Sequence, residues 1–146
     1  MLETSIERIV LTAWSEEDVY GCAIKVLLAD DADLMRRAIR FLLRQREELA
    51  VEGEASSLPE AIEKARELRP DVVVIDLNMA GRDRVLPAEV KTLLNGAKIL
   101  AITFGMDDGT AELAFRIGVA KLLDKMNLSE ELIPTILELG LGPELV

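Results

Sequence analysis

Histidine is absent from this sequence and cysteine nearly so. Without an imidazole the chain cannot run Ser-His-Asp or Cys-His catalysis, cannot form a histidine metal site, and cannot carry a phosphoryl group on a histidine of its own. The single cysteine, Cys22, has no partner for an internal disulfide. Any chemistry here must come from carboxylates, hydroxyls, lysine or an oxygen-binding cation.

Long apolar runs are also missing. No run approaches the roughly 20 residues of a membrane-spanning helix, and the start MLETSIERIV lacks the basic lead and apolar stretch of a secretory signal. We therefore expect a cytoplasmic protein without a membrane segment. The net charge of −10 repels phosphate backbones, so we expect no direct DNA binding. A chain of 146 residues, 50% of them hydrophobic, has the size of one domain with a buried core.

Short apolar runs alternate with segments of helical period. Five runs predict β-strands, and a predicted helix follows each of them. This alternation is typical of an α/β protein with a doubly wound, five-stranded parallel sheet between two layers of helices, a three-layer α/β/α arrangement. The predicted strands are KVLLA (25–29), AVEGEA (50–55), DVVVIDL (71–77), KILAIT (98–103) and VAKLLD (119–124).

Capping residues locate several helix ends. Ser57 with Glu60 predicts a capping box for the second helix, and Asn127 with Glu130 predicts one for the last helix. Asn95-Gly96 is expected to end the third helix. The predicted helices cover 34–43, 57–68, 87–94, 107–117 and 127–139.

Polar side chains stand where the predicted strands end. They are Asp30 and Asp31 after the first strand, Asp76 in the third, Thr103 in the fourth and Lys125 after the fifth. Ligands of parallel sheets bind beyond the carboxyl ends of the strands, so these side chains should converge. Two like charges about 4 Å apart cost roughly 4 kcal/mol at an effective dielectric of 20. Mg²⁺ or Mn²⁺ would remove that conflict, because both prefer oxygen ligands.

The same residues predict phosphoryl transfer. Lysine and threonine beside a metal supply a cation and a hydroxyl donor for phosphoryl oxygens. Asp76 stands alone in the most apolar strand and is the candidate nucleophile, which would form an acyl phosphate. Asp30 and Asp31 are a pair and are expected to hold the metal.

The ordered set LLADD, VVVIDLNM, LAIT and LLDK resembles the receiver domain of two-component response regulators. The resemblance covers residues 24–140 and implies the flavodoxin-like receiver fold. Residues 1–23 would be an N-terminal extension, either a short helix or disordered, and residues 141–146 a C-terminal tail. The DKMNL segment at the end of the fifth predicted strand looks like that of receivers joined to helix-turn-helix output domains. Since no output domain follows, we expect a single-domain regulator or a fragment of a longer protein.

The resemblance implies a role for each acidic residue. Asp31 and Asp76 would ligate Mg²⁺ together with the backbone carbonyl of Asn78, and Asp30 would act mainly through a water. Asp76 would accept the phosphoryl group from a sensor histidine kinase or a histidine phosphotransfer protein. The modified domain would then bind an unknown downstream protein, and the family's usual interaction face allows a homodimer.

The resemblance also implies how the signal is passed on. Lys125 would pair with the phosphoryl group, and Thr103 would bond to it when the switch turns on. Leu122 occupies the place of the family's switch aromatic. Phe104 follows Thr103 where a small residue is commoner, so its ring is expected to narrow access to the phosphoryl group.

Alternatives stay open at several positions. Asp30 and Asp31 could simply cap the first helix, and its arginines (Arg36, Arg37, Arg40 and Arg44) could be a solvated face or a docking face. A pseudo-receiver would act as a phosphorylation-independent interaction module. A haloacid dehalogenase-type hydrolase is disfavoured, because Asn78 stands where that group needs a second aspartate. We expect no enzyme activity beyond phosphorylation and dephosphorylation at Asp76.

Overall fold

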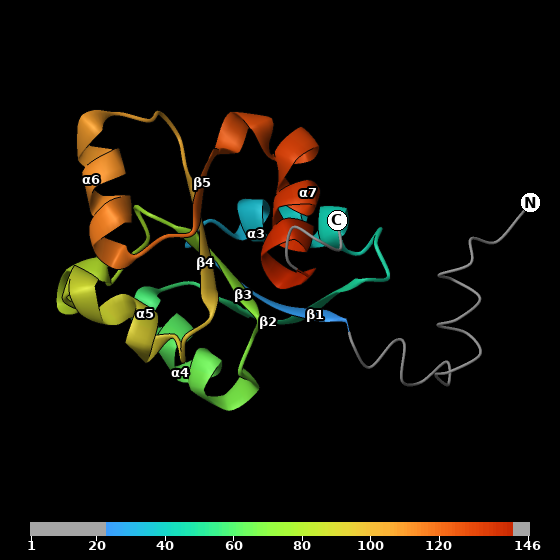
Figure 1. Ribbon diagram of the computed structural model, residues 1–146, viewed down its shortest axis with the longest axis horizontal. Helices are drawn as coiled ribbons and strands as arrows, with labels where there is room; N and C mark the ends of the chain where they lie inside the picture. Colours follow the sequence, from blue (N-terminus) through green and yellow to red (C-terminus); the bar gives the residue numbers. More distant parts are fainter. Residues whose placement is uncertain (1–22, 142–146) are drawn as a thin grey trace, which may run out of the picture.

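Five parallel strands form one sheet in the order β2-β1-β3-β4-β5 (Figure 1). The computed structural model describes residues 23–141, so the predicted extension and tail lie outside the described residues except at positions 23 and 141. The strands are β1 (Ile24–Ala29), β2 (Leu49–Ala55), β3 (Val72–Asp76), β4 (Lys98–Thr103) and β5 (Lys121–Asp124). The predicted doubly wound α/β architecture is confirmed.

Each strand is followed by helical structure. The helices are α3 (Asp33–Leu43), α4 (Leu58–Leu68), α5 (Val90–Leu93), α6 (Asp108–Ile117) and α7 (Leu128–Leu141), with the 3-10 helices η1 (Arg82–Arg84), η2 (Pro87–Glu89) and η3 (Lys125–Asn127). No described helix combines the length and apolarity needed to cross a bilayer.

Helix α5 is much shorter than the predicted helix 87–94. Its first turn is the 3-10 helix η2, which Pro87 opens, and only four residues are α-helical. The chain then leaves the helical region at Asn95 and Gly96, which have φ angles of 63° and 74°. Both residue types tolerate this left-handed conformation, so the predicted stop at Asn95-Gly96 is confirmed.

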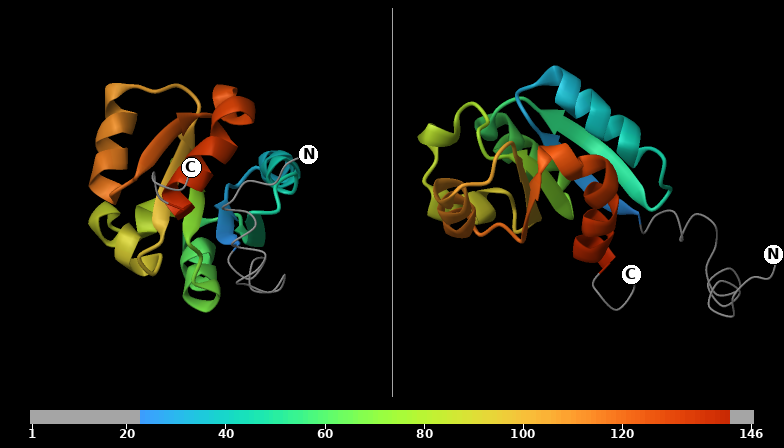
Figure 2. Two further views of the ribbon diagram at one scale, coloured as in Figure 1. Left: turned by 45° about the vertical axis from the view of Figure 1, so that its right-hand side comes forward. Right: turned by 90° about the horizontal axis from the view of Figure 1, so that it is seen from above.

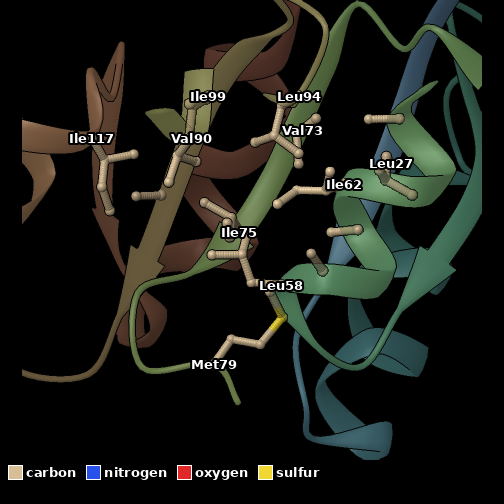
Figure 3. Packing of buried hydrophobic residues seen from close by; sticks show 14 of the residues in the cluster. Leu27, Leu58, Ile62, Val73, Ile75, Met79, Val90, Leu94, Ile99 and Ile117 are labelled. Atoms are coloured by element: carbon tan, nitrogen blue, oxygen red, sulfur yellow. The ribbon is translucent and has the colours of Figure 1, made fainter. Parts of the chain in front are cut away.

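Apolar side chains alternate between the two faces of the sheet and form two cores. Helices α4, α5 and α6 cover one core, and α3 and α7 cover the other (Figure 2). In the central strand β3, Val73 and Ile75 join the first core (Figure 3), whereas Val72 and Val74 join the second. Burial on both faces explains why this strand is apolar up to Asp76, its last residue.

The predicted Ser57 cap is confirmed, and the last helix begins differently. Ser57 Oγ accepts the Glu60 amide at the start of α4, and Asp107 caps α6. At the last helix, the side chain of Asp124 accepts the Met126 amide and opens η3. Because η3 runs directly into α7, the helical turn begins at Lys125, two residues ahead of the predicted start at Asn127.

Candidate functional site

The carboxyl ends of four adjacent strands bring the predicted site residues together. Asp30 follows β1, Asp76 ends β3, Thr103 ends β4 and Lys125 follows β5. These strands are direct neighbours in the sheet, so their ends form one continuous edge. All three polar residues at the ends of β1, β3 and β4 are buried: Asp30, Asp76 and Thr103.

Lys125 lies between the carboxylates of Asp30 and Asp76. Its Nζ is 2.8 Å from Asp30 Oδ2 and 3.3 Å from Asp76 Oδ2, and its side chain is only 6% exposed. Burial alone would lower the pKa of Lys125, but the contact with Asp30 and the negative charges of Asp76 and Asp30 outweigh it, so the pKa lies above its ordinary value. Lys125 therefore stays charged at neutral pH, and its nearest partner is Asp30.

Three carboxylates form an oxygen-rich cluster at this edge. One oxygen from each of Asp30, Asp31 and Asp76 lies within 4.8 Å of the others. Asp31 is exposed, so the cluster is open to solvent on that side. The three carboxylates carry three formal negative charges and Lys125 carries one positive charge. The net negative charge that remains can be balanced by a divalent cation. Oxygen-only donors at this spacing suit a hard cation such as Mg²⁺.

Tight turns hold two of these carboxylates in place. Asp30 Oδ1 accepts the Ala32 amide at 2.8 Å, and Asp76 Oδ1 accepts the Asn78 amide at 2.9 Å. The alternative that Asp30 and Asp31 cap the first helix is wrong. The N-cap of α3 is Ala32, which makes no side-chain capping bond, so the two aspartates are left for the cluster.

The remaining predicted residues lie beside the cluster on β4 and β5. The Thr103 hydroxyl donates a long hydrogen bond of 3.5 Å to the backbone carbonyl of Phe104. The Phe104 ring is 58% exposed, and Lys125 Nζ lies 5.2 Å from its centroid, a cation–π contact. Leu122 pairs with Ala101 across β5 and β4 and is partly buried against the first core.

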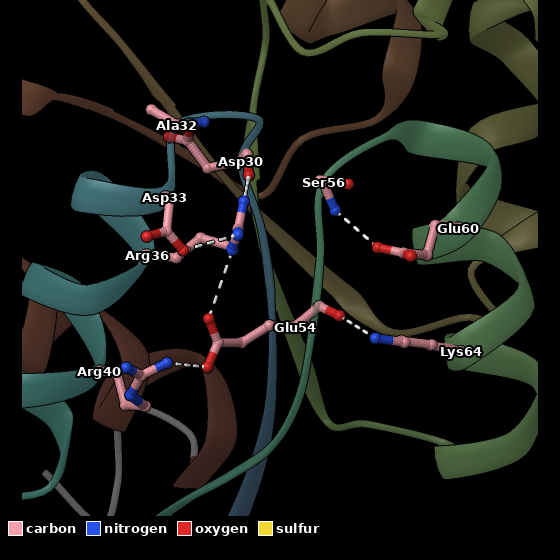
Figure 4. A network of polar contacts seen from close by, with 9 residues as sticks. All are labelled: Asp30, Ala32, Asp33, Arg36, Arg40, Glu54, Ser56, Glu60 and Lys64. Atoms are coloured by element: carbon pink, nitrogen blue, oxygen red, sulfur yellow. Dashed lines mark hydrogen bonds and ion pairs between the residues drawn. The ribbon is translucent and has the colours of Figure 1, made fainter.

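A polar network behind Asp30 was not predicted from the sequence (Figure 4). Arg36 and Arg40 on α3 both form ion pairs with Glu54 on β2, so this part of the arginine face is not simply solvated. Lys64 on α4 donates to the Glu54 carbonyl. The signal in the sequence was a charged residue, Glu54, at the end of the second strand opposite arginines spaced four apart.

Comparisons with known proteins agree with this geometry. Residues 26–137 match the family model described as the response regulator receiver domain. The chain is 33% identical over 115 residues to the response regulator protein VraR of Staphylococcus epidermidis, covering 78% of this chain and 55% of that protein. It is 35% identical over 113 residues to a protein-glutamate methylesterase/protein-glutamine glutaminase of Methanococcoides burtonii, covering 75% of this chain and 32% of that protein.

A solved structure gives the same picture of the fold. The two-component response regulator of the LuxR family from Aurantimonas sp. superimposes with a TM-score of 0.73 at 28% identity, covering 82% of this chain and 86% of that chain. The curated relatives are longer proteins: this chain spans 55% of the first and 32% of the second.

Proposed function

The chain belongs to the family of response regulator receiver domains, and on that premise we propose that it takes a phosphoryl group onto Asp76 from a phosphohistidine donor. The observation that carries this proposal is the position of Lys125, whose ammonium touches both Asp30 and Asp76 while Asp31 completes the carboxylate cluster. A pseudo-receiver would have no need to keep a lysine and three carboxylates in contact.

Each residue of the cluster has a role in this reaction. We assign Asp31, Asp76 and the Asn78 backbone carbonyl as ligands of Mg²⁺, which Mn²⁺ can replace, with Asp30 acting mainly through a water. When bound, the metal supplies positive charge for the phosphoryl oxygens. Lys125 supplies a second positive charge, and its raised pKa keeps that charge in place.

The transfer itself exchanges one bond to phosphorus for another. A carboxylate oxygen of Asp76 forms the new O–P bond, and the P–N bond of the donor breaks. The electron pair of that bond passes to the donor imidazole, which takes up a proton from water. Because this chain has no histidine, the donor must be another protein, either a sensor histidine kinase or a histidine phosphotransfer protein.

The phosphorylated domain then changes its partner binding. We propose that the Thr103 hydroxyl breaks its long hydrogen bond to the Phe104 carbonyl and donates to a phosphoryl oxygen instead. Leu122 has no aromatic ring, so it cannot act as the rotating ring of the family. The partner that the phosphorylated domain binds is a downstream protein or a second copy of this chain, and not DNA, because the net charge of −10 repels phosphate backbones. We propose no activity on other substrates, because Asn78 lacks the carboxylate of an aspartyl hydrolase.

Incubation with acetyl phosphate and Mg²⁺, followed by intact mass, tests the proposal. We expect one phosphoryl adduct that hydroxylamine removes, since acyl phosphates are labile to it. Asp76→Asn should abolish the adduct, because the amide is not a nucleophile. Asp83→Asn is the matched control: it removes an exposed carboxylate from the following loop and should leave the adduct unchanged.

Two results would overturn the proposal. One is the absence of an adduct from acetyl phosphate and from a phosphorylated histidine kinase alike, together with no Mg²⁺ binding. The other is an adduct of normal stoichiometry in Asp76→Asn, which would place the phosphoryl group on another residue.

A further inference from the structure

Arg36 connects the candidate metal cluster to the second strand. Its guanidinium uses three nitrogens for three oxygens: Nη1 is 2.5 Å from the Asp30 backbone carbonyl, Nη2 is 3.1 Å from Asp33 Oδ1 and Nε is 3.3 Å from Glu54 Oε1 (Figure 4). The Arg36 side chain is 15% exposed, so these contacts are largely shielded from water. A planar guanidinium suits such a contact set, because its five N–H donors have a fixed geometry.

A bulge in β2 places Glu54 where Arg36 can reach it. The register of β1 and β2 shifts between Val26 and Leu27, which pair with Val51 and Gly53, so Glu52 is the extra residue. One extra residue reverses the side-chain alternation of a strand. Glu54 consequently lies on the α3 face of the sheet, and its carboxylate meets two arginines of α3.

The carbonyl that Arg36 holds belongs to the peptide between the two cluster aspartates. The Asp30 amide donates to the Ala55 carbonyl at 3.0 Å, and Asp30 Oδ1 accepts the Ala32 amide. Arg36 thus holds the carbonyl of the peptide that leads into Asp31, and the other two bonds hold the peptides on either side of it. The direction of the exposed Asp31 side chain depends on that peptide plane, since no other hydrogen bond to Asp31 is recorded among residues 23–141.

We propose that Arg36 is a positioning residue of the metal site, which fixes the Asp30–Asp31 peptide so that Asp31 faces the cation. This inference rests on the proposed function, because it assumes that the carboxylate cluster binds Mg²⁺. Arg36 contacts the Asp30 carbonyl, Asp33 and Glu54, and none of these contacts is with a side-chain oxygen of the cluster. It acts through the backbone of a ligand residue, as outer-shell partners of metal sites do.

Whether Mg²⁺ binds more weakly or more tightly after Arg36 is removed distinguishes a positioning role from a purely electrostatic one. Arg36 is a cation near a cation site, so Coulomb repulsion alone would make Mg²⁺ bind more tightly once the charge is removed. Positioning predicts the opposite, because a loose peptide lets Asp31 turn away. Arg40 provides the matched control: it shares the Glu54 contact but has no recorded contact with the cluster backbone in the part of the chain that is described.

The experiment is a titration with Mn²⁺ alone, followed by electron paramagnetic resonance of the free ion, on the full chain and its variants. We expect Arg36→Ala to weaken Mn²⁺ binding about tenfold, the low end for outer-shell partners. Arg40→Ala should change it by less than about twofold, because its ion pair is partly solvated. Urea unfolding should show the larger loss of stability in Arg36→Ala, because Arg36 loses contacts with Asp30, Asp33 and Glu54 whereas Arg40 loses only its ion pair with Glu54. Mn²⁺ binding is therefore compared under conditions in which both variants are fully folded.

Arg36→Lys keeps the charge and guards against a folding defect in Arg36→Ala. A single ammonium cannot hold the Asp30 carbonyl and Glu54 with one fixed geometry, so we expect binding weaker than wild type by about threefold. Equal or tighter Mn²⁺ binding in Arg36→Ala, or equal weakening in Arg40→Ala, would overturn the inference and leave the proposed function intact. Failure of the wild-type chain to bind Mn²⁺ would overturn the inference and the assignment of the metal ligands, and absence of the phosphoryl adduct as well would overturn the proposed function.

Discussion

The two sides of the site are held by different kinds of contact. On the β1–α4 side, which comprises residues 24–68, Arg40 and Lys64 bond to Glu54 across 14 and 10 residues of sequence. On the β4–α6 side, which comprises residues 98–117, the side-chain bonds are local: Asp107 accepts from Thr110, three residues away. There Phe104 and Met106 are exposed, at 58% and 48%.

The sequence separation of these contacts determines which side of the site can move. A local contact such as the Asp107 cap travels with its own helix when a loop shifts, so it need not break. Long-range contacts join separate elements and must break before those elements move apart. The β1–α4 side is thus suited to hold a metal ligand still, and the β4–α6 side is suited to rearrange around the phosphoryl group.

Lys125 spans the site from the β5 end to Asp30 on the β1–α4 side, and its loss should have the largest effect. Lys125→Met keeps the side-chain length but removes the charge that faces the phosphoryl oxygens. We expect adduct formation from acetyl phosphate to slow by about a hundredfold to a thousandfold, as for other single electrostatic donors. Intact mass against time measures this rate.

The control for that variant is Lys121→Met, which changes an exposed lysine at the start of β5, the strand that precedes Lys125. We expect a wild-type rate for it. Metal binding in Lys125→Met should be retained, because removing a neighbouring cation reduces repulsion. A wild-type phosphorylation rate in Lys125→Met would show that its ion pairs are structural only.

Two glycines with the same backbone conformation test the comparison through stability: Gly81 follows β3 and packs against Pro59 of the β1–α4 side, and Gly105 lies on the β4–α6 side. Gly81 and Gly105 have φ angles of 83° and 71°. A Cβ added at Gly81 would lie 2.6 Å from Pro59 Cδ, a ring atom of α4 that cannot swing away, whereas none of the described atoms lies within 4 Å of one added at Gly105. Gly81→Ala adds overpacking to the left-handed strain, so we expect it to cost about 2–3 kcal/mol and Gly105→Ala about 1 kcal/mol.

Urea unfolding of both glycine variants gives the difference directly. Equal losses would mean that the loop at Gly81 shifts away from α4 at no cost. The contrast between a packed loop and an open loop would then fail.

Local signals predicted the strands and the convergence of the site. An apolar run ends in Asp30, Asp76 or Thr103 because the buried part of the strand stops there, and parallel order brings those ends together. The face on which Glu54 lies could not be predicted, since the bulge that reverses it depends on pairing with β1. The contact between Lys125 and Asp30 was missed for a similar reason: it joins strands that are not neighbours.

Competing local signals at the helix ends explain the remaining differences between the predicted and the observed helices. The predicted helix 87–94 contains Pro87 and ends in Asn95-Gly96, which leaves room for little more than one α-helical turn after η2. At the last helix, Asp124 was read only as the end of a strand. Its side chain also bonds to the Met126 amide, and that bond starts the helical turn early.

The smallest effect is expected at Phe104, where two consequences of one change compete. Phe104→Ala removes a cation–π contact worth about 0.5–1 kcal/mol at an exposed site, which by itself would loosen Lys125. Asp30 and Asp76 still hold the ammonium at 2.8 Å and 3.3 Å, however, so Lys125 should stay in place. The opened access should then dominate, and we expect the adduct to form and to hydrolyse faster than in the wild type.

Phe115→Ala is the matched control, because it removes an aromatic ring that is 86% exposed on α6 and has no recorded contact with the described cluster residues. Formation and decay of the adduct, both followed by intact mass, should match the wild type in that variant. Slower formation with unchanged decay in Phe104→Ala would mean that the ring acts through Lys125 and not as a cover. The β4–α6 side would then contribute to holding the site, and its contrast with the β1–α4 side would be one of degree.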